Sequence, residues 1–137
     1  RMSLAAPARY HADELDVDEI LEAAWDGARV LIVPPNLGLV RPLLIRLEAG
    51  LSTANHDGVK VYRANGLERI TFPSGGRIMF RSWRGHGQSL HGLVVDRAYL
   101  LELGDVPDDD WDDLLAVLLP GMMISLDPRL VMIGFHR

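Results

Sequence analysis

Ala28-Arg-Val-Leu-Ile-Val33 is the stretch of sequence that decides the fold. Beyond Arg29 it is a continuous apolar run rich in β-branched residues, which is typical of a strand buried in a parallel sheet. Two prolines follow directly and end it. Helices are predicted on both sides: residues 13–27 before the strand, closed by a glycine, and residues 36–51 after it, with Asn36 as the N-cap and Pro42 in the first turn.

The middle of the chain changes character. Residues 59–63, 69–72 and 77–83 are short segments with period-two alternation of apolar and polar residues. Turn signals separate them, Asn65-Gly66 in the first gap and Pro73-Ser-Gly-Gly76 in the second. This pattern predicts a β-hairpin or β-meander.

The last part of the chain returns to alternating strands and helices. A polar loop (82–91) leads to a predicted buried strand (93–96) that ends in Asp96, and an acidic run (105–113) leads to a predicted helix (109–119) and a final strand (130–135). Buried strands that alternate with helices favour a mostly parallel sheet flanked by helices. We therefore expect an α/β fold with an inserted meander, in one domain that covers residues 1–137.

Composition limits the chemistry. The chain of 137 residues has no cysteine, which excludes disulfides and thiolate sites, and a net charge of −5, which disfavours non-specific binding to nucleic acid. No stretch reaches the roughly 18 apolar residues of a membrane span, so we expect a cytoplasmic protein without membrane contact. Arg1 before Met2 is interpreted as a tag remnant, with the natural start at Met2.

The order of motifs in the second half resembles the ATPase core of bacteriophage terminase large subunits. Residues 65–82, which read Asn-Gly-Leu-Glu-Arg-Ile-Thr-Phe-Pro-Ser-Gly-Gly-Arg-Ile-Met-Phe-Arg-Ser, are similar to the hairpin of that family. The glycine-containing loop 85–89 and the segment 92–98 follow, as its glycine-rich loop and Walker B strand do. The resemblance covers residues 3–136 and implies a P-loop NTPase-like fold from a phage or prophage, without the nuclease domain that follows the core in terminases.

The residues that would hold ATP are missing from the position that the resemblance assigns to the Walker A loop. That position falls on Pro7-Ala-Arg-Tyr-His-Ala-Asp13, whose Pro7, Arg9, His11 and Asp13 replace the expected residues. A phosphate-binding loop needs glycines, a lysine and a Ser or Thr hydroxyl, and none of them is present. Acidic residues between 13 and 19 also occupy the start of the following helix, whose positive dipole end would otherwise attract phosphate.

The Walker B position is half retained. The resemblance places Asp96 where the family has its magnesium-organising aspartate, and Arg97 where it has a glutamate that acts on the attacking water. Arginine cannot accept a proton, so hydrolysis is not expected. The family's coupling motif would fall on residues 134–137, and it is also unmatched.

Two further segments are candidates for partner binding. Arg81, Trp83, Arg84 and His86 combine cations and aromatic rings, which suits a protein interface or nucleic acid. Trp111 lies in the acidic run, which suits a helix start or a surface for a basic partner. A metal site or a catalytic triad drawn through His86, Ser89, His91 and Asp96 matches no known spacing.

The leading hypothesis is a terminase-like protein that does not hydrolyse ATP, needs no cofactor, and binds a protein partner or itself. The edge strand of the meander or an exposed tryptophan would supply an oligomer interface. One alternative is a divergent or split ATPase in which Asp96 holds magnesium, ATP is bound, and another chain supplies the lysine. The other is a DNA-binding accessory factor, whose affinity would collapse with salt.

Overall fold

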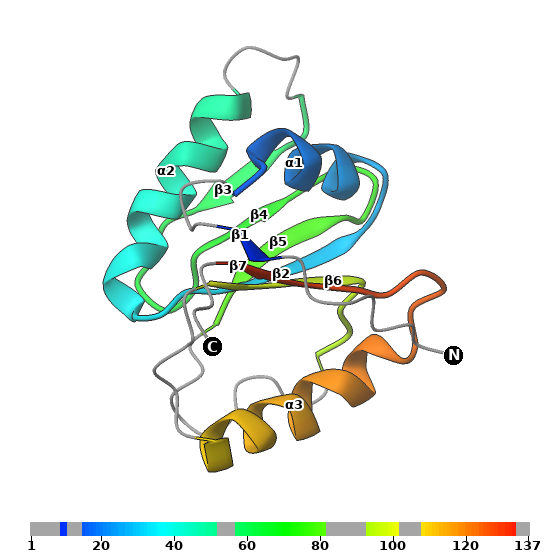
Figure 1. Cartoon of the computed structure of the whole chain (residues 1–137). Helices are drawn as coiled ribbons and strands as arrows, with labels where there is room; N and C mark the ends of the chain where they lie inside the picture. Colours follow the sequence, from blue (N-terminus) through cyan, green and yellow to red (C-terminus); the bar gives the residue numbers. More distant parts are fainter. Residues whose placement is uncertain (1–8, 11–14, 52–56, 82–92, 102–107, 134–137) are drawn as a thin grey trace.

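The computed structural model describes residues 9–10, 15–51, 57–81, 93–101 and 108–133. These residues form three layers, with α1 and α2 on one face of a central sheet and α3 on the other (Figure 1). The elements in chain order are β1 (Arg9–Tyr10), α1 (Val17–Trp25), β2 (Arg29–Val33), the short 3-10 helix η2 (Leu37–Leu39), α2 (Val40–Leu51), β3 (Lys60–Tyr62), β4 (Arg69–Thr71), β5 (Arg77–Phe80), β6 (Arg97–Leu101), α3 (Asp108–Met122) and β7 (Arg129–Ile133).

The sheet has seven strands in the order β1-β7-β6-β2-β5-β4-β3. All neighbours from β1 to β5 pair in parallel, whereas β5, β4 and β3 form an antiparallel meander. The prediction of a mostly parallel α/β sheet with an inserted meander is therefore confirmed. Within the described residues, no helix has both the length and the apolar character needed to cross a bilayer.

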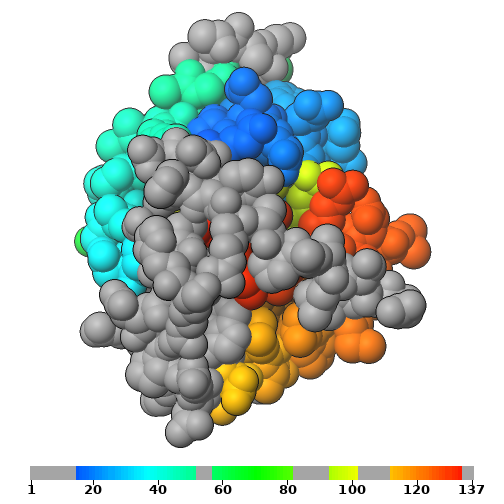
Figure 2. All heavy atoms as spheres, in the orientation of Figure 1, coloured from blue at the N-terminus to red at the C-terminus, as the bar shows by residue number. Residues whose placement is uncertain are grey.

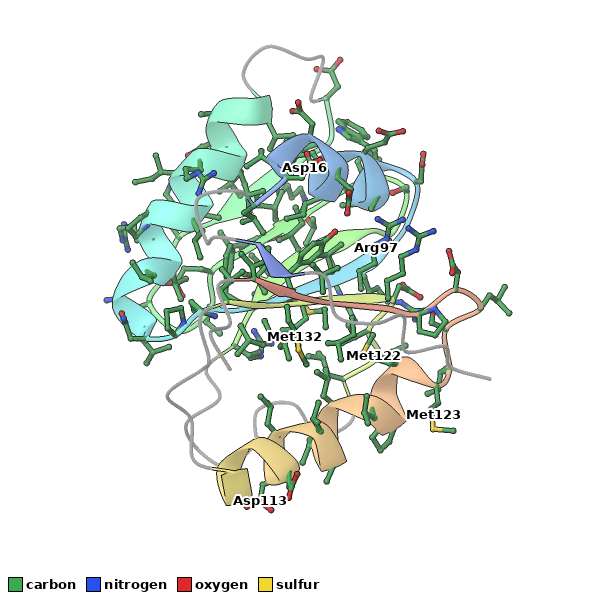
Figure 3. The ribbon with its side chains drawn as sticks, viewed as in Figure 1. Asp16, Arg97, Asp113, Met122, Met123 and Met132 are labelled. Atoms are coloured by element: carbon green, nitrogen blue, oxygen red, sulfur yellow. The ribbon has the colours of Figure 1, made fainter. Side chains whose placement is uncertain are left out.

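The core lies on both faces of β2, as its apolar run predicts. Val30 and Ile32 pack into the cluster beneath α1 and α2, while Leu31 and Val33 pack into the cluster beneath α3. All four side chains have 0% of their surface exposed. Figure 3 shows the α3 cluster from the side: Met122 lies between the helix and the sheet, and Met123 points away from the sheet.

Two helices begin later in the structure than the sequence predicts. In α1 the helix begins at Val17, because the side chain of Asp16 caps it by accepting a hydrogen bond from the Glu19 backbone N–H at 3.0 Å. The helix predicted from Asn36 begins only at Val40, since Asn36 precedes η2 and its side chain makes no capping hydrogen bond.

The strand predicted at 93–96 is wrong. The strand is β6, which starts at Arg97, and the apolar residues before it form a connection packed on α3. Val95 is fully buried there, and its N–H donates to the Gly121 carbonyl at 3.2 Å. A Cβ on Gly121 would lie 2.0 Å from the Leu93 carbonyl oxygen, so only glycine permits this contact. Burial against a helix thus produced the apolar pattern that predicted a strand.

Candidate functional site

The carboxyl ends of the parallel strands are where open α/β sheets bind their ligands. Most connections at this edge, the segments 11–14, 82–92, 102–107 and 134–137, lie outside the described residues. They include His11 and Asp13 of the predicted Walker A position together with Trp83, Arg84 and His86. Pro7 also lies outside the described part, and the side chains of Arg9 and Trp111 are not described either. The described part of the edge includes the start of α1, the connection from β2 to η2 and the last residues of the strands.

The start of α1 is closed by its own carboxylates. β1 precedes it, so the connection between Tyr10 and Asp16 holds the strand-to-helix position at which phosphate-binding loops occur. Asp16 caps the helix, and Asp18 and Glu19 follow in the first turn, all three exposed. Negative charge therefore occupies the end of the helix dipole that attracts anions.

The carboxyl end of β6 carries no magnesium ligand among the described residues. Its last residue is Leu101, which is buried with 2% of its surface exposed. Glu102 follows directly in the sequence and lies outside the described part. Sequence reasoning missed this position because it placed the strand one segment too early. The signal was present in Ala98-Tyr-Leu-Leu-Glu102, where an apolar run also ends in a carboxylate.

Asp96 lies at the opposite edge of the sheet, immediately before β6, so its predicted place at a strand's carboxyl end is wrong. Its carboxylate accepts hydrogen bonds from Arg29 at the start of β2: from the backbone N–H at 2.8 Å, Nε at 2.9 Å and Nη2 at 3.1 Å. Burial alone raises the pKa of Asp96, but the hydrogen bonds from Arg29 and Ser125 outweigh it and lower the pKa to about 2. Asp96 is thus an ion-pair partner that joins two strands.

An open hollow of about 350 Å³ lies beside this pair. Asp26, Arg97 and Asp127 contribute to its wall, together with Ile124 and Leu126 from the connection after α3. That connection projects at one edge of the molecule in Figure 2, where it is coloured orange-red. No group of acidic or histidine side chains suited to hold a metal ion occurs among the described residues.

Arg97 faces α1 from the first position of β6. Its Nη1 lies 3.6 Å from Glu19 Oε1, and the hydroxyl of Tyr99 donates to the same oxygen at 2.8 Å. Burial raises the pKa of Tyr99, and the neighbouring Glu19 carboxylate raises it further. The residue in which the sequence suggested a lost catalytic glutamate therefore connects β6 to the first turn of α1.

Arg81 alone of the predicted partner-binding residues has a described side chain. It follows β5, and its Nη1 donates to the Phe80 carbonyl at 2.8 Å. Burial lowers the pKa of Arg81, and repulsion from Arg69 and Arg77 lowers it further. Sequence reasoning did not group these residues, although the meander register that brings them together was predictable from its turns.

Comparison with known proteins supports the fold. No family model matches the chain, and no curated protein matches it. Among solved structures, the large terminase from a thermophilic bacteriophage superposes with a TM-score of 0.61 at 12% identity, over 93% of this chain and 32% of that one. The same terminase in complex with ADP gives a TM-score of 0.59 at 14% identity, over 85% of this chain and 29% of that one.

The chain has a terminase-like fold. The thermophilic-phage terminase in complex with ATP-γ-S also superposes, with a TM-score of 0.56 at 14% identity. This chain spans 28% of the length of that protein, so the likeness concerns the terminase-like fold and not the activity of the whole phage protein.

Proposed function

We propose that this chain is a terminase-like domain of a phage or prophage that does not hydrolyse ATP and acts as a module that binds protein, including copies of itself. The observation that carries the proposal is the closed start of α1. The Asp16 carboxylate already accepts the Glu19 N–H, one of the free backbone donors that a phosphate would use.

Electrostatics supports the same conclusion. A phosphate charge about 4 Å from a carboxylate meets a repulsion of roughly 4 kcal/mol at a surface-like dielectric, and the first turn presents Asp18 and Glu19 besides the cap. The 7–16 segment contains no lysine to offset this repulsion. Leu101, a buried hydrocarbon side chain, ends the strand from which the resemblance implies a magnesium ligand.

One residue favours the alternative of a divergent ATPase. Glu102 follows β6 directly and is a carboxylate at the sequence position where water activation would require one. In this alternative a lysine from another chain would complete the site, and magnesium would need ligands other than Asp96.

Calorimetry of ATP with magnesium at low salt tests the proposal, with the thermophilic-phage large terminase as the positive control. We expect no heat and no thermal stabilisation at millimolar nucleotide. Saturable binding by the wild-type chain would overturn the proposal. Phosphate release by the wild-type chain that Glu102→Gln loses while still binding nucleotide would then support the ATPase alternative. Asp16→Asn keeps a capping oxygen without the charge. If only this variant binds nucleotide, the charge of Asp16 is what prevents binding in the wild-type chain.

A further inference from the structure

The charge of the chain is divided unevenly along the sequence. Residues 41–81, which form α2 and the meander, contain seven lysines and arginines against three acidic residues. All other residues together contain seven against sixteen. A protein that is acidic on average therefore carries one basic region, built mainly on β3, β4 and β5.

Within this region three arginines form a row on the α3 face of the sheet. Arg69 pairs in register with Met79, which packs in the cluster beneath α3, and Arg77 and Arg81 lie two residues before and after Met79. Since side chains alternate along a strand, all three project from this face. At about 3.3 Å per residue, Arg77 and Arg81 are about 13 Å apart, with Arg69 beside the midpoint. We call these three residues the arginine row.

The arginine row has no carboxylate partner among the described residues. Arg69 lies over the ring of Tyr62 at 4.0 Å, and the buried Nε of Arg77 has no hydrogen-bond partner in the described structure. The α3 cluster includes Met79 of β5 but no described residue of β3 or β4, so it ends at β5. Adjacent cations without counter-charges repel one another, and bound carboxylates would relieve that repulsion.

Helix α1 carries the complementary pattern on the opposite face. Asp18, Glu22 and Asp26 are exposed and recur every four residues, which places carboxylates about 6 Å apart over a span of about 12 Å. None of the three forms an ion pair with a described residue, unlike Glu19. Asp26 stands at the C-cap of α1, where negative charge opposes the helix dipole, so helix stability does not explain it. We call these three residues the carboxylate stripe.

We propose that the carboxylate stripe of one copy of this chain docks on the arginine row of a second copy. The two patterns carry opposite charges and agree in the number of groups and in span. They lie on opposite faces of the sheet, so the stripe of one molecule cannot reach the row of the same molecule (Figure 1). The contact is therefore head-to-tail and leaves a free stripe and a free row at the two ends of every pair. This inference rests on the proposed binding function and names its partner.

Sedimentation velocity on complementary charge reversals tests the docking. The stripe variant is Asp18→Arg with Glu22→Arg, and the row variant is Arg69→Glu with Arg81→Glu. We expect the wild-type chain to self-associate at low salt and to lose about tenfold in affinity at about 300 mM salt, because salt screens the exposed carboxylates and the half-buried arginines. Each variant alone should be monomeric, and an equimolar mixture should associate again, since each supplies the charge that the other needs. Arg46→Glu, an exposed change on α2, should leave association unchanged.

Several outcomes would overturn the docking. They are a wild-type chain that stays monomeric at low salt and high concentration, reversals that do not weaken association, and a mixture that does not recover it. Circular dichroism checks the fold of each variant, and Arg69→Gln with Arg81→Gln provides a milder row variant should the double reversal misfold. Binding of an oligothymidylate that the row variants lose would assign the row to nucleic acid instead. Failure here leaves the ATP calorimetry unaffected, so the two proposals fail separately.

Discussion

Arg29 and Asp96 join the starting ends of two neighbouring parallel strands. The guanidinium contacts both carboxylate oxygens, at 2.9 and 3.1 Å, and the Arg29 backbone N–H adds a bond of 2.8 Å. The Asp96 backbone N–H in turn donates to the Arg29 carbonyl at 2.8 Å. This two-way contact fixes the register of β2 against β6.

Replacement of Asp96 by asparagine should remove a pH-dependent part of the stability. The pKa of Asp96 is about 2 in the fold and 3.8 otherwise, so its stabilising effect is complete above pH 3.8 and is lost as the pH falls through about 2. We expect Asp96→Asn to lower the free energy of unfolding by about 1–2 kcal/mol at pH 7, with allowance for solvent screening. Urea unfolding between pH 7 and pH 2 should show the two proteins converging at the acid end.

Asp127→Asn serves as the control for that series, because Asp127 contacts Arg129 at 3.5 Å with a side chain that is 75% exposed. If Asp127→Asn lowers the free energy of unfolding as much as Asp96→Asn does, Asp96 is not the source of the acid-sensitive stability.

Removal of the Tyr99 hydroxyl should weaken the connection between β6 and α1. Tyr99→Phe takes away the hydrogen bond to Glu19, so we expect a loss of about 1 kcal/mol at pH 7. Because the pKa of Tyr99 is raised in the fold, the wild-type protein should also lose stability as the pH rises above the ordinary tyrosine value of 10.0. The phenylalanine variant should lack that component of the alkaline loss, as measured by thermal unfolding across the alkaline range.

Tyr62→Phe is the matched comparison, since its ring can still lie under Arg69. Equal effects of the two substitutions at alkaline pH would show that Tyr99 is not the responsible group.

A methyl group at Gly76 should destabilise the fold. The turn between β4 and β5 packs against the end of α1, and a Cβ at Gly76 would lie 1.9 Å from the Ala24 carbonyl oxygen. The Ser74 hydroxyl donates to that oxygen at 2.9 Å, so the turn cannot retreat without breaking this bond. We expect Gly76→Ala to cost about 2–3 kcal/mol in urea unfolding.

Gly38→Ala is the counterpart, because its nearest contact is the side chain of Asn36 at 3.0 Å on an exposed segment. If both substitutions lower the free energy of unfolding by the same small amount, the end of α1 must move freely against the turn, contrary to the packing described above.

Loss of the Asp16 cap should destabilise α1 through geometry more than through charge. Asp16→Ala removes the oxygen that accepts the Glu19 N–H, with an expected cost of about 1 kcal/mol. Asp16→Asn keeps such an oxygen and should cost less. Chemical unfolding measures both, and a larger loss for asparagine than for alanine would refute the capping role.

Local sequence patterns were sufficient to predict most of the fold. The apolar run of β2 and the turn Pro73-Ser-Gly-Gly76 have causes within a few residues, and the structure has the strand and the meander there. Strand β6 was misplaced because burial against α3 gives Val95 the same apolar signature as a strand residue. The partner of Tyr99 is Glu19, which is 80 positions away, and no local pattern shows such a contact.

The candidate site was predictable in part. The acidic start of α1 was read correctly from composition, because carboxylates before an apolar periodic segment mark a helix start. The arginine row was not, because it depends on the cross-strand pairing of Arg69 with Met79. Counting back from the turn between β4 and β5 gives that register, and only the register shows which side chains share a face.

The self-capped α1 has a consequence for the energetics of the whole domain. A ligand that binds only the folded state raises its stability in proportion to the logarithm of ligand concentration. Under the proposed function, a helix start whose Glu19 N–H is already bonded to Asp16 offers nucleotide no such linkage. If the proposed function holds, the melting temperature of this domain should not change with the concentration of ATP or ADP, and only a protein that binds the folded domain should raise it.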